Sequence, residues 1–247
     1  MNLEEKTFNL IIILVEPSGP INIGSIARLC SNFNVNQLRI VSPKCDIREL
    51  DARKMALKGF KFIEYCKIYN TLCESISDCN LVLATSGRVN YSEESEPFPL
   101  ENISTWLKNF REIGKLGVIF GREDRGLTNN ELLMAQRVFT INTNINNPSL
   151  NLSHAVSIVL YEINKLEKLN TKGKITYNLA SSSQMEETFS DIEKLLLKIG
   201  YILPHTSNSM ISKFKKYILK AETSKHQLDT LRGVVHQINW ALKNLKN

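Results

Sequence analysis

The stretch LIIILVEPSGPINIGSIARLC (residues 10–30) decides the fold, because it joins a strand-like run to a helical pattern through a glycine-bearing loop. LIIILV (10–15) is continuously apolar, which predicts a buried strand. Apolar residues then follow the i, i+3, i+4, i+7 spacing of an amphipathic helix: Ile26, Leu29, Cys30 and Phe33. A strand, a glycine loop and a helix in this order are typical of α/β proteins, in which such a loop holds a phosphate.

The loop EPSGPINIGSIAR (16–28) does not meet the requirements of a nucleotide site. Gly19 and Gly24 have the Walker A spacing, but Ser25 replaces the lysine and Ile26 the Ser/Thr, and GxGxxG is absent. We predict a helix N-terminus near residue 24 that attracts an anion, with Arg28 one turn inside. The alternative is a tight turn in which Asn22 bonds the local backbone and Arg28 forms a salt bridge.

Four further runs predict strands with few internal charges: QLRIVS (37–42), NLVLATS (80–86), LGVIFG (116–121) and RVFTINT (137–143). Near-continuous apolar strands favour a mostly parallel sheet with helices on both faces, and a further helical pattern follows over residues 152–166. We therefore predict an α/β domain over residues 1–169.

A polar linker is expected over residues 170–184, followed by a small helical C-terminal extension over 185–247. Three helical patterns mark the extension: Ile192, Leu195, Leu196 and Ile199; Ile211, Phe214 and Ile218; and Leu228, Leu231, Val235, Ile238, Leu242 and Leu245. Ser224 and Gln227 have the spacing of a capping box at the start of the third helix.

Composition restricts the class of protein only mildly. The net charge of +6 and the pI near 9.0 favour a polyanionic partner. Five cysteines without a CxxC pair favour reduced thiols in a cytoplasmic protein and predict no structural metal. No apolar run approaches the ~20 residues that span a bilayer, and the N-terminus lacks signal-peptide order, so we expect no membrane association.

Two further clusters follow predicted strands, at the edge where α/β sheets bind ligands. FGREDRGL (120–127) sets four charges between two glycines, and TNNE (128–131) predicts a helix cap directly after it. INNPSLNLSHAV (145–156) combines a rigid proline with amide and hydroxyl side chains. TSGR (85–88) adds a small, open strand-end loop, and His154 is expected to be structural or at the surface.

Three of these stretches, in this order and spacing, closely resemble the motifs of the SpoU/TrmH family of RNA ribose 2′-O-methyltransferases, part of the SPOUT superfamily. They are N-x-G-S-x-A-R (22–28), F-G-R-E-x-x-G-L (120–127) and S-L-N-L-S-x-A-V (149–156), and the resemblance covers about residues 9–166. It implies a parallel sheet with a C-terminal trefoil knot, S-adenosylmethionine as cofactor, and a homodimer whose interface completes the active site.

The resemblance also implies roles for individual residues. Asn22 and Arg28 are expected to be catalytic, and Glu123 and Asn151 to support the site. The expected cofactor-binding residues are Thr85, Ser86, Gly87, Gly121, Ile141, Pro148, Ser149 and Leu150. A ribose 2′-OH would attack the cofactor methyl group. A guanidinium stays protonated in proteins, so Arg28 is better suited to orienting phosphate and stabilising the incipient alkoxide than to acting as a base. The family resemblance implies in addition that this arginine assists deprotonation.

The helical extension, with LRG at 231–233, is similar to the branch of the family that modifies cytidine or uridine at position 32 of the tRNA anticodon loop. Lys213, Lys216 and Lys220 form one stripe of a helix and are expected to contact tRNA; the alternative is a solvated face. Two other functions remain open: a ribosomal RNA 2′-O-methyltransferase, and a non-catalytic RNA-binding protein of the same fold.

Overall fold

A computed structural model describes residues 8–87, 97–110, 113–144, 146–165 and 178–244. The chain divides into two compact units, Met1–Thr176 and Tyr177–Asn247. Each is described by itself.

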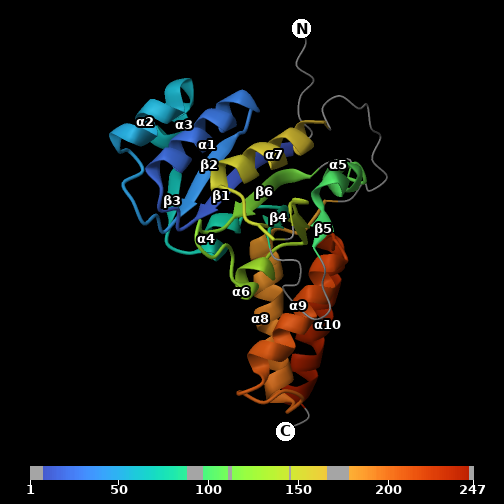
Figure 1. Ribbon diagram of the computed structural model, residues 1–247. Coiled ribbons are helices and arrows are strands. Elements are labelled where there is room, and N and C mark those ends of the chain that lie inside the picture. Colours follow the sequence, from blue (N-terminus) through green and yellow to red (C-terminus); the bar gives the residue numbers. More distant parts are fainter. Residues whose placement is uncertain (1–7, 88–96, 111–112, 145, 166–177, 245–247) are drawn as a thin grey trace. The chain divides into compact units, whose positions relative to one another are not determined.

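Unit 1 is built on a seven-stranded sheet in the order β3-β2-β1-β6-β4-β7-β5, with every neighbouring pair parallel (Figure 1). The strands are β1 (Phe8–Val15), β2 (Gln37–Val41), β3 (Lys67–Tyr69), β4 (Leu81–Thr85), β5 (Phe98–Pro99), β6 (Gly114–Phe120) and β7 (Arg137–Thr140). The prediction of an α/β fold with a parallel sheet is confirmed. The sequence patterns did not predict β3 and β5, because strands of three and two residues are too short to show a hydrophobic pattern.

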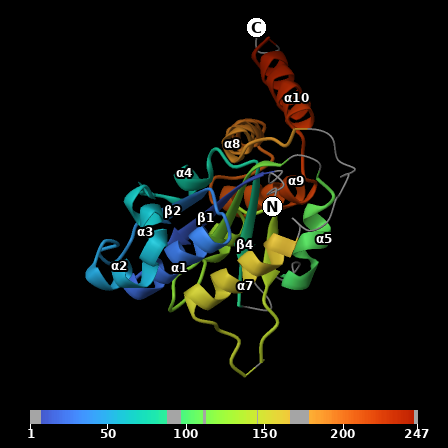
Figure 2. The same cartoon turned by 90° about the horizontal axis from the view of Figure 1, so that it is seen from above.

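Helices cover both faces of this sheet. They are α1 (Pro20–Asn32), α2 (Leu50–Ala56), α3 (Phe60–Glu64), α4 (Leu72–Ile76), α5 (Ile103–Leu107), α6 (Asn129–Leu132) and α7 (Leu152–Asn164), with 3₁₀ turns η1 (Leu57–Gly59) and η2 (Leu100–Asn102). Figure 2 shows α1, α2, α3 and α7 on one face. The opposite face carries α4 and α6, whose Leu72, Ile76 and Leu132 belong to the same buried apolar cluster as Ile11 and Ile13 of β1.

Helix α1 begins one turn earlier than the prediction of a helix N-terminus near residue 24. Its N-cap is Gly19, and Pro20 occupies the first turn, where its fixed φ and missing N–H carry little cost. Gly24 is therefore inside the helix and buried; a Cβ there would lie 2.2 Å from the carbonyl oxygen of Ala52. The free N–H groups of the helix start lie near Gly19 instead.

The described part of unit 2 forms three helices: α8 (Ser182–Lys198), α9 (Ser207–Lys220) and α10 (Lys225–Asn244). Their common core includes Phe189, Ile211 and Leu228. The predicted capping box is present: the backbone N of Ser224 donates to Gln227, and the backbone N of Gln227 donates to the Ser224 hydroxyl.

Two details of unit 2 differ from the sequence predictions. Residues 178–184 do not form a linker, because Leu179 and Ala180 are buried and Ser181 caps α8; the preceding residues 166–177 lie outside the described residues. The predicted apolar stripe of the third helix is buried at Leu228 and Val235, but Ile238 is 41% exposed. Leu245 lies outside the described residues.

Among the described residues, no helix has the length and apolar character needed to span a bilayer.

Candidate active site

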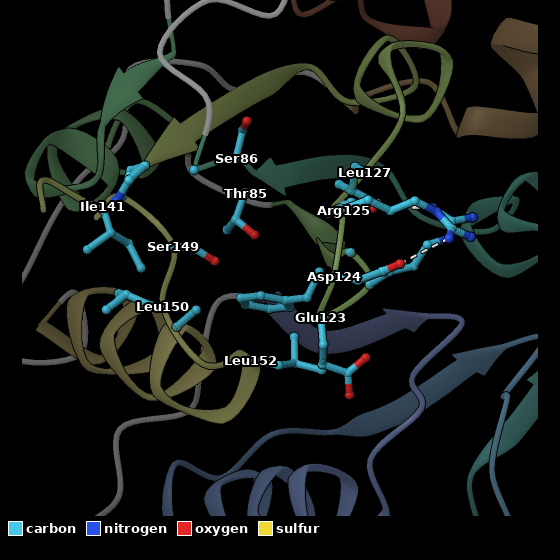
Figure 3. A pocket seen from close by; sticks show the side chains of 17 residues that line it. Thr85, Ser86, Glu123, Asp124, Arg125, Leu127, Ile141, Ser149, Leu150 and Leu152 are labelled. Atoms are coloured by element: carbon cyan, nitrogen blue, oxygen red, sulfur yellow. Dashed lines mark hydrogen bonds and ion pairs between the residues drawn. The ribbon is translucent and has the colours of Figure 1, made fainter. Parts of the chain in front are cut away.

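A pocket of about 280 Å³ opens where β6, β4 and β7, three neighbouring strands, end (Figure 3). Thr85, Ser86 and Gly87 follow β4, the loop 120–127 follows β6, and Ile141 follows β7. The segment 148–150 and the first turns of α7 close the pocket. Carboxyl ends of parallel strands converge on one edge, so residues far apart in sequence meet there.

Every residue predicted to hold a cofactor lines this one pocket: Thr85, Ser86, Gly87, Gly121, Ile141, Pro148, Ser149 and Leu150. Apolar side chains, among them Phe120 and Leu127, form most of the wall, and the Thr85 and Ser149 hydroxyls bring polar groups to it (Figure 3). Apolar walls with a few placed polar groups are typical of small-molecule sites. Arg88, the last residue of TSGR, lies outside the described residues.

The loop after β1 holds a carboxylate of the protein itself. Glu123 accepts hydrogen bonds from the backbone N of Ser18 at 3.2 Å and of Gly19 at 3.1 Å, and from the Ser18 hydroxyl at 3.2 Å. These donors lie at the start of α1, where the helix dipole favours negative charge. The anion that the loop was predicted to attract is therefore supplied within the chain by Glu123.

Glu123 also connects the other two clusters through Asn22. The Asn22 amide donates to Glu123 at 3.3 Å, and its carbonyl oxygen accepts from the Asn151 amide at 3.0 Å. Asn151 is the N-cap of α7 and accepts from the backbone N of Ser153 and His154. The alternative interpretation, in which Asn22 bonds its local backbone, does not hold, because both ends of its side chain bind residues more than one hundred positions away.

Arg122 fixes the loop after β6. It donates to Glu16 at 2.7 Å and to Glu131 at 2.9 Å, and its side chain is only 9% exposed. The Arg122 hydrogen bond holds the pKa of Glu16 below its ordinary value. Burial raises the pKa of Glu131, but hydrogen bonds from Arg122 and the Thr128 backbone outweigh it, so this pKa is also lowered. Glu131 completes the predicted capping box with Thr128.

Arg28 does not line the pocket. It lies in the third turn of α1, is exposed, and forms no hydrogen bond or ion pair with the part of the chain that the structure describes. The salt bridge of Arg28 in the alternative interpretation is therefore not found there. A single chain brings Asn22, Glu123 and Asn151 together and leaves Arg28 facing solvent.

Sequence reasoning missed several residues of the site. Asp124 and Arg125 line the pocket, and Arg125 pairs with Asp124 at 3.1 Å and with Glu16 at 3.4 Å. Glu16 could have been found, because it directly follows β1, the neighbour of β6, and so lies beside Arg122. The role of Ser18 depends on loop geometry that no local pattern encodes.

The remaining predicted residues lie elsewhere. Lys213 and Lys220 are exposed on α9 and Lys216 is half-buried there. His154 is exposed at the start of α7, and the cysteines are free thiols. No group of His, Cys, Asp or Glu suited to holding a metal occurs within the described ranges.

Two family models match the chain. The SpoU rRNA methylase family matches residues 9–161, and the C-terminal domain of the tRNA methyltransferase TrmJ matches residues 183–247. Among curated proteins, a tRNA (cytidine-2′-O-)-methyltransferase TrmJ of Methanocaldococcus jannaschii is 33% identical over 220 residues, covering 89% of this chain and 95% of the relative.

A tRNA (cytidine/uridine/adenosine-2′-O-)-methyltransferase TrmJ of Pseudomonas aeruginosa is 28% identical over 249 residues, which cover 95% of each chain. Among solved structures, TrmJ from Z. mobilis ZM4 superposes with a TM-score of 0.79 at 28% identity, covering 93% of this chain and 98% of that one.

The parallel sheet, the pocket at its carboxyl edge and the three motif loops that meet there define a methyltransferase of the SpoU class. With the match over residues 9–161 and the 33% identical relative, the chain belongs to the SpoU methylase family and, within it, to the TrmJ proteins.

Proposed function

We propose that the protein transfers a methyl group from S-adenosylmethionine to a ribose 2′-OH of tRNA, at a cytidine or uridine at position 32 of the anticodon loop. The observation that carries this proposal is the hydrogen-bonded connection of the three motif loops: Glu123 and Asn151 both bind Asn22, next to the pocket. The tRNA substrate, the free cysteines and the basic net charge together favour a cytoplasmic enzyme.

The pocket residues fit S-adenosylmethionine. Its adenosine suits the apolar wall of Ile141 and Leu150, with backbone groups of the strand-end loops as hydrogen-bond partners. At Gly87 the nearest atom to an added Cβ among the described residues, chain neighbours aside, is the carbonyl oxygen of Pro148 at 3.5 Å, which favours close approach of a ligand to the backbone. The bound cofactor supplies an electrophilic methyl group on a sulfonium centre.

The polar residues beside the pocket position the nucleotide. Glu123 and Asn151 fix the orientation of the Asn22 side chain, which is held from both ends. Arg28 binds the phosphate next to the target ribose and stabilises the alkoxide that develops on the 2′ oxygen. Positioning accounts for most of the rate, because the reacting groups need alignment more than a strong acid.

A homodimer completes the site in this proposal. Arg28 lies outside the pocket of its own chain, so a second copy would have to bring its Arg28 to this pocket. The paired helices α1 and α7 carry exposed apolar side chains suited to such a contact: Ile21 is 52% exposed and Tyr161 58%. Light scattering tests this part: a mass of two chains is expected, and a monomer active at the same specific rate would contradict it.

A trefoil knot at the C-terminal end of unit 1 also belongs to the proposal. Two features support it: β7 lies between β4 and β5, both earlier in the chain, and the segment that follows β7 returns to the pocket before α7 packs on α1. Such threading is a rare exception to unknotted topology.

Unit 2 contributes to tRNA binding through Lys213, Lys216 and Lys220. We expect replacement of all three by glutamine to weaken tRNA binding and to lower its salt dependence by about three units of slope. The matched control replaces Lys194, Lys198 and Lys225, which are exposed on the same unit, with little expected effect. Equal losses in both variants would contradict a specific contact.

The decisive experiment incubates the protein with labelled S-adenosylmethionine and bulk tRNA, then maps 2′-O-methyl groups in the product. Label at position 32 is the expected result. Label at another nucleotide would revise the position, label only in ribosomal RNA would favour the alternative enzyme, and RNA binding without label would indicate a non-catalytic protein.

A further inference from the structure

The segment Leu50–Glu64, which contains α2, η1 and α3, carries four basic residues against two acidic ones and has no part in the site described above. Arg53, Lys54, Lys58 and Lys61 are all exposed. Within the described residues, only Lys54 among these four has an ion-pair partner, Asp51 at 3.9 Å. Most of these cations therefore lack a counter-charge from the protein, which favours an anionic partner.

This segment packs directly against α1, at Gly24 and at Ala27–Arg28. A Cβ at Gly24 would lie 2.2 Å from the carbonyl oxygen of Ala52 in α2. A Cβ at Gly59 would lie 2.3 Å from the carbonyl oxygen of Ala27 and 2.7 Å from Cα of Arg28. Two glycines thus allow backbone-to-backbone contact, and Lys58 is the direct neighbour of the residue that touches Arg28.

The link between α2 and η1 is strained. Leu57 has a φ of 48°, a conformation that leucine rarely adopts, and its side chain is 58% exposed. The apolar side chain gains little from burial there, so core packing does not account for the strain. Leu57 lies two residues before Gly59, which packs on α1 beside Arg28, and such strain concentrates at functional sites.

We propose that Arg28 and the basic residues Arg53, Lys54, Lys58 and Lys61 form one continuous surface that binds the phosphates of the RNA substrate. This proposal rests on the proposed function and extends it: the catalytic unit itself holds the RNA backbone, in addition to unit 2. The glycine contacts fix the surface to the helix that carries Arg28, so binding there sets the position of the phosphate at Arg28.

The test compares the full-length variant Lys58→Gln/Lys61→Gln with the control Lys108→Gln. Lys108 directly follows α5, next to β5, at the opposite edge of the sheet from β3. We expect the double variant to raise the KM for tRNA about 10-fold, with kcat at saturating tRNA within 2-fold, and the control to change neither. The salt dependence of tRNA affinity should fall by about two units of slope.

Fluorescence anisotropy of labelled tRNA measures binding without any methyl transfer, so the inference is tested separately from the proposed reaction. An unchanged KM and an unchanged tRNA affinity in the double variant, with wild-type melting behaviour, would overturn the inference. If the unmodified protein binds tRNA through these lysines but transfers no methyl group, the proposed function fails and the binding surface stands.

Discussion

The pocket and the surface around Arg28 differ in how many of their charged side chains are bound by other residues of the chain. Around the pocket, Arg122 is bound to Glu16 and Glu131, and Glu123 accepts from three donors at the start of α1. Arg28 and the nearby Lys58 have no such partners within the described residues. The pocket residues are therefore held in place by the chain itself, whereas in our proposal the basic side gains its partners from RNA and from a second copy.

The largest effect expected from this comparison is at Arg28. Arg28→Ala should reduce tRNA methylation at least about 10³-fold, because the alkoxide loses its charged donor, while S-adenosylmethionine affinity stays within about 2-fold. Single-turnover kinetics and calorimetric titration of the cofactor measure the two quantities. Turnover near that of the unmodified protein would remove Arg28 from the reaction.

Glu123 tests whether the pocket side depends on a charge. Glu123→Gln should lower kcat/KM about 100-fold, because charge-assisted hydrogen bonds to Ser18, Gly19 and Asn22 are weakened. The matched control Glu74→Gln alters an exposed glutamate on α4 and should leave kcat/KM within about 2-fold. A similar small change in both variants would mean that the network does not position Asn22.

Asp78 tests the rigidity of the sheet that carries the site. It binds the buried Arg39 through both carboxylate oxygens, at 2.6 and 3.0 Å, and this hydrogen bonding holds the pKa of Asp78 well below its usual range. Asp78→Asn should lower the free energy of unfolding by about 2 kcal/mol, less than for a fully buried pair because the Asp78 side chain is 43% exposed. Asp51→Asn, at a weak surface pair, should cost under about 0.5 kcal/mol.

The pH dependence follows from the lowered pKa of Asp78. Its contribution to stability is complete above its unfolded pKa of about 3.9 and is lost as pH falls toward the lower folded value. Below pH 4, the Asp78→Asn variant should therefore lose less stability than the unmodified protein. If the free energy of unfolding falls equally with pH in both proteins, Asp78 is not the source of this pH dependence.

The sequence predicted the strand-end loops, because apolar runs mark the strands and parallel strands end at one edge of the sheet. The family resemblance assigned Thr85, Gly121 and Ile141 to the cofactor site, and all three line the pocket at that edge. The apolar pattern that begins at Ile26 placed the start of α1 too late in the chain. The helix begins earlier because Gly19 is its N-cap and Pro20 favours the first turn.

The rest could not be derived from local patterns. The contacts of Glu123 with Ser18 and Gly19 join residues more than one hundred positions apart, and they depend on strand order. The positive φ of Leu57, two residues before Gly59, could not be predicted either, because leucine rarely adopts this conformation.

The smallest effect expected is at Gly233, in the middle of α10. A Cβ there would meet no other group within 4 Å, so Gly233→Ala should raise the free energy of unfolding by about 0.5–1 kcal/mol in urea denaturation. Gly200→Ala is the contrasting control: with a φ of 74°, it should lower stability by about 1 kcal/mol. If the stabilised Gly233→Ala variant binds tRNA more weakly, this face of α10 contacts RNA, as proposed for Arg28. If its tRNA affinity is unchanged, the Gly233 face of α10 takes no part in RNA binding.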